Sequence, residues 1–201
     1  MKFTSIRLAR PLLLAFAALL ASAPATAAVL SFSGTRTNAT PGGAPGGRCG
    51  SALLISFAPD SFQASGTSTL GNFSYTASHC IAAPPPGNYF DGQFTWDFGA
   101  DTLFGTYEGA LAALAPGQFS ISEQILFTGG TGRLAGATGS ALYTGVLSFG
   151  QVNGGFATFA DGSFAGTLDA PGIPEPSSWA LLISGFGLAG AVQRKRRLRH
   201  A

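Results

Sequence analysis

Residues 93–109 have the sequence QFTWDFGADTLFGTYEG, and this stretch decides the fold class. Aromatic and polar residues alternate from Phe94 to Phe98, which places the aromatic side chains on one face of an extended strand. Residues 99–101 interrupt the pattern, and a second strand-like run follows at 102–109. Two such runs joined by a short turn predict β-strands connected as a hairpin.

The same texture extends through the middle of the chain, where short runs rich in Phe, Thr, Tyr and Ile are separated by Gly, Pro, Asn or Asp. The runs predicted as strands are 29–37, 51–57, 61–69, 72–78, 93–98, 102–109, 118–127, 141–149 and 162–168. The predicted turns are Gly71-Asn72, Asp91-Gly92, Asn153-Gly154 and Asp161-Gly162, because these residues tolerate positive φ. Eight or nine strands at this spacing predict an all-β barrel or sandwich.

The composition of the 201 residues excludes two classes of protein. Only 10% of the residues are charged and 46% are hydrophobic, so the chain is not a highly charged disordered protein. Residues 28–172 contain three arginines and eight acidic residues, a formal balance of −5. Nucleic acid is therefore not expected as a partner of this part of the chain.

The amino terminus has the features of an export signal. Lys2, Arg7 and Arg10 precede the apolar run 11–20, and small residues then lead to Ala25-Thr26-Ala27. The apolar run is shorter than the roughly 20 residues that span a bilayer, which disfavours a permanent anchor. We therefore predict a cleavable signal helix at 1–27, cut after Ala27 by signal peptidase.

Export changes the interpretation of the two cysteines, Cys49 and Cys80. A single pair in an oxidising compartment usually forms a disulfide, and these residues lie 31 positions apart without a CxxC motif. His79 beside Cys80 leaves open a metal or nucleophile role, but residues 28–172 contain no second histidine to complete a ligand set. We predict a disulfide, no bound metal and no cofactor.

The carboxyl terminus combines three features in series. Pro171, Pro174 and Pro176 favour an extended segment, and the residues from Ser177 to Val192 carry no charge. A basic tail follows, which is expected to remain cytoplasmic and to fix the orientation of a membrane helix. Its residues are Arg194, Lys195, Arg196, Arg197 and Arg199. A plain membrane anchor or a buried helix with a solvated basic end is the alternative by spacing alone.

The order Pro174-Glu175-Pro176, then Trp179-Ala180, a Gly-interrupted apolar helix and a basic cluster resembles the PEP-CTERM sorting signal in its PEPxxWA form. The resemblance implies a Gram-negative source, recognition by an exosortase, and removal of the transient membrane helix. It also implies delivery to the cell surface or to an exopolysaccharide (biofilm) matrix, with exopolysaccharide as a further partner. The expected domains are a signal peptide at 1–27, a β-barrel domain at 28–172 and a sorting signal at 173–201.

A second resemblance concerns the β-rich body. Residues 101–109 (DTLFGTYEG) and 127–139 (FTGGTGRLAGATG) are similar to allene oxide cyclase-like and dirigent-like proteins. This resemblance implies an antiparallel eight-stranded barrel whose mouth binds apolar ligands. The functional residues of those proteins have no position-by-position match in this chain.

The chain has no GxSxG, HExxH or GxxxxGK[ST] motif, the patterns typical of several hydrolases and nucleotide-binding proteins. Two close carboxylates could act as general acid and base on a glycan, and the candidates are Asp97, Asp101, Glu108 and Glu123. The alternative is that these acids are exposed side chains on a sheet. Asp91, Asp97 and Asp101 are too widely spaced for a calcium loop. Arg133 is expected to bind carbonyl groups or a carboxylate such as Asp161 or Asp169.

The sequence therefore predicts a non-catalytic exported protein with a structural or adhesive role in the matrix. The alternative is a barrel that binds or converts a small apolar ligand. A cavity lined by Phe with one buried acid would favour the ligand, whereas a filled core would favour the matrix role.

Overall fold

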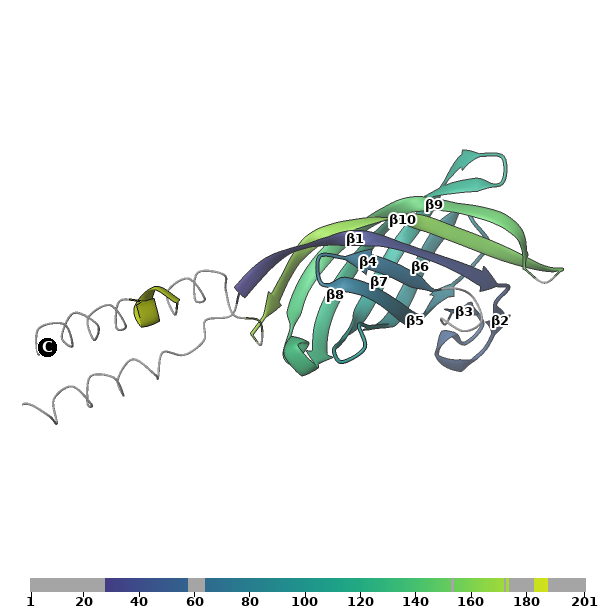
Figure 1. Ribbon diagram of the computed structural model, residues 1–201. Helices are drawn as coiled ribbons and strands as arrows, with labels where there is room; N and C mark the ends of the chain where they lie inside the picture. The colour runs from purple at the N-terminus through teal and green to yellow at the C-terminus, as the bar shows by residue number, and fades with distance from the viewer. Residues whose placement is uncertain (1–27, 58–63, 153, 172, 174–182, 188–201) are drawn as a thin grey trace, which may run out of the picture.

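The computed structural model describes residues 28–57, 64–152, 154–171, 173 and 183–187 (Figure 1). The predicted signal peptide with Ala27, the sorting motif at 174–180 and the basic tail at 194–199 lie outside these residues. Of the predicted membrane helix, only residues 183–187 are described, and they are helical and exposed. In the described part of the chain, no helix has the length and apolar character needed to cross a membrane.

The described residues form ten β-strands and two short 3-10 helices, η2 (Gly47–Cys49) and η3 (Gly132–Leu134). The strands are β1 (Ala28–Pro41), β2 (Ala44–Pro45), β3 (Leu53–Phe57), β4 (Ser65–Ser68), β5 (Gly71–Ile81), β6 (Gly87–Asp97), β7 (Thr102–Ala115), β8 (Gln118–Thr131), β9 (Thr138–Val152) and β10 (Gly155–Ala170). All their pairings are antiparallel. The all-β antiparallel prediction is confirmed, and each predicted run overlaps a strand.

Eight of these strands are hydrogen-bonded in a closed circuit. The order is β5-β4-β1-β10-β9-β8-β7-β6, and β6 pairs again with β5. Within β5, residues 71–74 pair with β4, and residues 77–81, farther along the same strand, pair with β3. β2 pairs with β3 at the margin of the sheet. The strands consequently surround a common interior (Figure 1).

The two ends of this circuit differ. At one end Ala28 pairs with Ala170, so the chain enters and leaves the sheet there (Figure 1). Ile173, the first residue of the predicted sorting signal, packs against the core. At the other end Pro41 pairs with Ala157, and the β7–β8 and β9–β10 hairpins turn at the same end as β2 and β3 (Figure 1).

The end with the termini is filled by aromatic side chains. Trp96 is fully buried, and its ring stacks on Phe73 with centroids 4.5 Å apart. Phe32, Phe127 and Phe164 surround the same indole at 5.0–5.9 Å. Alternation brings these residues together, because each lies on the inward face of its strand. Such contacts add about 0.5–1.5 kcal/mol per pair beyond burial, so this end is a packed core.

A bulge interrupts the alternation of β6. Tyr89 pairs with Gly109 of β7, but the next pair is Gly92 with Tyr107, so β6 has one extra residue. Asp91 lies in this bulge with φ 51°, in the left-handed region that aspartate tolerates better than most residues.

The bulge reverses which side chains of β6 face inward. Tyr89 is 4% exposed, whereas Phe90 faces outward and is 42% exposed.

The predicted turn at Asp91-Gly92 is wrong, because the positive φ of Asp91 belongs to a bulge within a strand. The predicted turn at Asp161-Gly162 is also wrong, since both residues lie inside β10 in regular pairing with β9. Of the predicted turn Asn153-Gly154, Asn153 lies outside the described residues, and Gly154, with φ 80°, lies between β9 and β10.

Candidate functional site

A cavity of about 360 Å³ occupies the end of the sheet opposite the termini. This volume falls within the range of about 300–1,000 Å³ found for small-molecule pockets. Its outer part is lined mainly by apolar side chains, and its inner part by polar ones. The apolar lining comprises Leu53, Ile55, Phe57, Ile81, Pro84, Pro85, Leu111, Ile121, Leu147, Phe149, Phe156 and Ala160.

The base of the cavity holds a buried ion pair between β1 and β8. Arg36 Nη2 donates to Glu123 Oε1 at 2.5 Å, and the two side chains are 5% and 3% exposed. Tyr89 donates its hydroxyl proton to Glu123 Oε2 at 2.8 Å. Both carboxylate oxygens therefore have partners. Burial raises the pKa of the Glu123 carboxyl, and the contacts with Arg36 and Tyr89 partly offset that rise.

Three aromatic rings surround the Arg36 guanidinium. Its Cζ lies 4.0 Å from the ring centroid of Tyr143, 5.9 Å from that of Tyr75 and 6.0 Å from that of Tyr107. These distances are within the range of cation–π attraction, which is strongest when the cation is desolvated. Burial is the largest single effect and opposes the charge on Arg36, but Glu123 and the tyrosines Tyr75, Tyr143 and Tyr107 together outweigh it, and the pKa of Arg36 is raised. The guanidinium remains charged.

Two further polar networks contribute His79, Tyr107, Asn38 and Thr40 to the inner part of the cavity wall. His79 Nδ1 and the Tyr107 hydroxyl are 2.9 Å apart, and burial, followed by the charges of Arg36 and Arg48, lowers the pKa of His79 to about 4. His79 is therefore neutral at pH 7. Tyr75 donates to Asn38 Oδ1 at 2.8 Å, and Asn38 Nδ2 donates to Thr40 Oγ1 at 2.8 Å.

Glycines make room for the interior tyrosines. At each of these glycines a Cβ would collide with a tyrosine side chain, so the aromatic ring occupies the space of the missing side chain. The contacts are Tyr89 with Gly109, Tyr107 with Gly92, and Tyr143 with Gly145 and Gly162.

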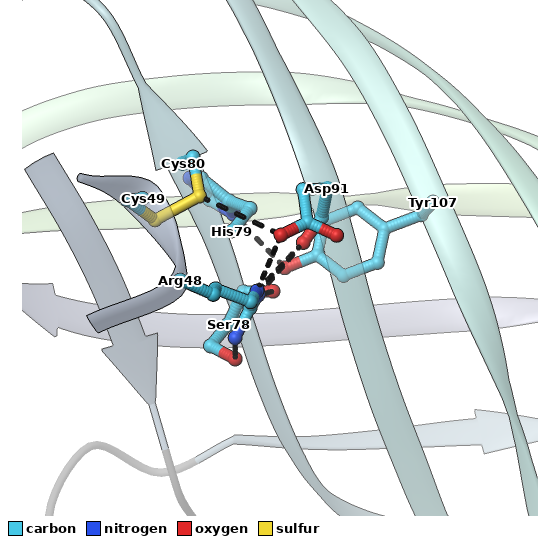
Figure 2. Close-up of polar contacts among 7 residues, drawn as sticks. All are labelled: Arg48, Cys49, Ser78, His79, Cys80, Asp91 and Tyr107. Carbon is cyan, nitrogen blue, oxygen red and sulfur yellow. Dashed lines mark hydrogen bonds and ion pairs between the residues drawn. A yellow bond between two sulfur atoms is a disulfide. The ribbon is translucent and has the colours of Figure 1, made fainter. Parts of the chain in front are cut away.

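A polar clamp outside the sheet holds the β6 bulge (Figure 2). Arg48 Nε donates to Asp91 Oδ2 at 2.8 Å, and Arg48 Nη2 donates to the carbonyls of Asp91 and Ser78, both at 2.7 Å. The predicted Cys49–Cys80 disulfide is present and ties η2, which carries Arg48, to β5. The clamp thus fixes the bulge that turns Tyr89 toward Glu123.

The four acids considered for a carboxylate pair do not gather in the cavity. Only Glu123 lines the cavity, whereas Glu108 is exposed and Asp97 accepts the Gly99 amide proton at 2.7 Å. Asp101 binds Arg133 Nε and Nη2 at 2.8 and 2.7 Å, which corrects the expectation that Arg133 would find Asp161 or Asp169. Within the described ranges, no three His, Cys, Asp or Glu side chains form a group suited to a metal ion.

Sequence reasoning missed Arg36 and the interior tyrosines as a group. A signal was present in residues 121–127 (ISEQILF), where Glu123 shares the period-two face of Ile121, Ile125 and Phe127. Arg36 likewise shares the inward face of Phe32 on β1. A charged residue on an apolar strand face predicts a buried partner, but its identity depends on which strands close the circuit.

Comparison with known proteins identifies one feature of the chain. The PEP-CTERM protein-sorting motif is present at residues 172–197. No curated protein and no solved structure matches the chain. The resemblance of the body to allene oxide cyclase-like proteins is therefore not confirmed by a relative.

Proposed function

We propose that the chain is an exported protein, processed by an exosortase, whose β-rich body binds a small apolar ligand in the cavity described above. The closed circuit of eight strands acts as a barrel in this proposal, and the activity is binding without chemical conversion. The sorting motif at 172–197 supports export. The observation that supports ligand binding is a cavity of about 360 Å³ with an apolar outer wall and a buried ion pair at its base.

The arrangement of the two ends fits this function. Ile173 of the sorting motif packs against the core at the filled end, whereas the cavity lies between the hairpin tips at the other end. The cavity mouth therefore points away from the place where the chain continues into its membrane signal. A ligand can enter while the protein is still anchored and after it has been released to the cell surface or matrix.

Ligand binding is tested by displacement of a hydrophobic fluorescent probe, such as N-phenyl-1-naphthylamine, from the full-length chain. The variant Ala160→Trp fills the cavity, and the control Ala165→Trp places the same side chain on the outer face of β10. We expect Ala160→Trp to lose probe binding and Ala165→Trp to retain it. Equal binding by both variants would place the probe outside the cavity and refute this function.

Export is tested by the intact mass of the protein recovered from its own cells and their matrix, with and without the exosortase. A matrix species that ends near 174–176 and depends on the exosortase is the expected result. A full-length tail in the membrane of both strains would contradict sorting.

A structural or adhesive role in an exopolysaccharide matrix is a second candidate, favoured by the outer face of β5, β6 and β7. Hydroxyl and amide side chains line a shallow depression there beside Phe104, which is 38% exposed. They include Thr76, Gln93, Thr95, Thr106 and Thr128. Retention of the protein on its own purified exopolysaccharide, lost in Gln93→Ala with Phe104→Ala, would support this role. Retention unchanged by these substitutions would contradict it.

A further inference from the structure

We infer that the ligand has an uncharged, hydrogen-bonding head and a single apolar chain, as in a monoacylglycerol or a long-chain alcohol, and that it binds with its head next to Arg36. This inference rests on the proposed function, because it specifies the ligand of the same cavity. It depends on three properties of the cavity: its charge balance, its unpartnered polar atoms and the length of its apolar wall.

The charge balance excludes an ionised head. Arg36 and Glu123 are the charged groups among the described residues that line the cavity, and they neutralise each other at 2.5 Å. His79 adds no charge at pH 7, because its pKa is lowered to about 4. A carboxylate head would therefore enter as an uncompensated buried charge, or would have to displace Glu123 from Arg36 and leave that carboxylate unpaired.

Two polar atoms beside the ion pair lack hydrogen bonds to the described residues. They are Arg36 Nε and the Tyr143 hydroxyl oxygen, and both are buried. The Tyr143 hydroxyl lies over Gly145, and Tyr143 lines the same cavity as Arg36 and the apolar side chain of Leu147. A neutral hydroxyl, ester or ketone group accepts hydrogen bonds from such donors without adding charge to the cavity.

The apolar wall begins where these polar atoms end. On β9, Tyr143, Leu147 and Phe149 lie on the inward face, and the six steps along the strand from Tyr143 to Phe149 span about 20 Å. Phe149 and Phe156 pack together at the mouth with centroids 5.3 Å apart, although they are 42% and 60% exposed. An extended chain can therefore run from the ion pair to this aromatic rim, whose rings are partly exposed to solvent.

The inference is tested by titrating the full-length chain at pH 8 with monolaurin and with laurate, which have the same twelve-carbon chain. We expect monolaurin to bind at least about tenfold more tightly, because laurate brings an unpaired charge. Equal or tighter binding of laurate would overturn the inference and leave the proposed function intact. Binding of neither compound nor of the fluorescent probe would refute both.

Two variants locate the head of the ligand. Tyr143→Phe removes the unpartnered hydroxyl and is expected to weaken monolaurin binding about fivefold, the effect of one hydrogen bond. Tyr75→Phe is the matched control, because the Tyr75 hydroxyl is bonded to Asn38 and Tyr75 does not line the cavity. Equal effects of the two substitutions would contradict the assignment of the head to Tyr143.

Glu123→Gln tests the role of charge directly. Removing this carboxylate frees the charge of Arg36, so the preference should shift toward laurate by at least about tenfold. Glu108→Gln is the control on the exposed face of β7 and should leave the preference unchanged. A folded Glu123→Gln variant that still prefers monolaurin to the original extent would overturn the inference.

Discussion

Arg36 and Glu123 lie 87 residues apart in the chain, yet they form an ion pair of 2.5 Å inside the closed sheet. The pair connects β1 with β8, which do not pair with each other in the sheet. Its position at the boundary between the filled end and the cavity gives the cavity a polar base. Desolvation of two charges is costly, so this arrangement is better explained by a role in the cavity than by stability.

Breaking this pair should be strongly destabilising. Arg36→Met leaves Glu123 buried without its counter-ion and is expected to cost about 3–5 kcal/mol of unfolding free energy. Arg133→Met is the control, because Arg133 is 74% exposed and Asp101 keeps the hydrogen bond from the backbone amide of residue 133, so we expect a smaller cost than that of Arg36→Met. Urea unfolding at pH 7 measures both. Similar costs for the two variants would argue against a desolvated pair.

Gly109 should be intolerant of a methyl group. A Cβ at this position would collide with the Tyr89 ring and the Ser122 carbonyl, so Gly109→Ala should cost about 1–3 kcal/mol and displace Tyr89 from Glu123. At Gly87 a Cβ would have no heavy atom within 4 Å, and Gly87→Ala should change stability by less than about 0.5 kcal/mol. Thermal unfolding of both variants checks this. A harmless Gly109→Ala would show that Tyr89 is not confined as described.

The bulge at Asp91 should depend on the backbone conformation of this residue as well as on its charge. Asp91→Asn keeps a side chain that tolerates φ 51° but loses the negative charge that pairs with Arg48. Asp91→Ala loses both the tolerance of this φ and the negative charge. We expect Asp91→Ala to be less stable than Asp91→Asn by about 1 kcal/mol. Denaturant midpoints measure the difference. Equal stabilities of Asp91→Ala and Asp91→Asn would show that the positive φ at this position does not contribute to the stability of the bulge.

His79 should make stability dependent on pH. Its pKa falls from 6.5 in the unfolded chain to about 4 in the folded protein, so the unfolded state binds the additional proton between these values. Its stabilising contribution is complete above pH 6.5 and is lost as the pH falls toward 4, with a total of about 3 kcal/mol.

Glu123, whose pKa is raised, acts in the opposite direction on acidification. The comparison is therefore made between the native chain and His79→Gln, by unfolding at pH 7, 6, 5 and 4. The native chain should lose more stability than the variant over this range. Parallel curves for the two proteins would show that His79 is not buried in its neutral form.

The strands could be predicted because alternation is a local property. The alternation at Phe94, Trp96 and Phe98 predicts a strand whatever strands lie beside it. The export signal likewise predicts a disulfide between the two cysteines. The bulge at Asp91 could not be predicted, because Asp-Gly with positive φ fits a hairpin turn equally well. The site depends on strand closure: only the circuit brings Arg36 of β1 to Glu123 of β8, and period-two patterns do not encode that order.

We propose that the cavity, and not the outer face, receives the ligand. The most direct test is a titration of the full-length chain with monolaurin, followed by methyl NMR of labelled isoleucine and leucine residues. We predict shifts at the cavity residues Leu111, Ile121 and Leu147, and none at Leu126 and Leu142, which are 51% and 50% exposed on the outer face. Shifts at Leu126 and Leu142 without changes at the three cavity residues would contradict the claim.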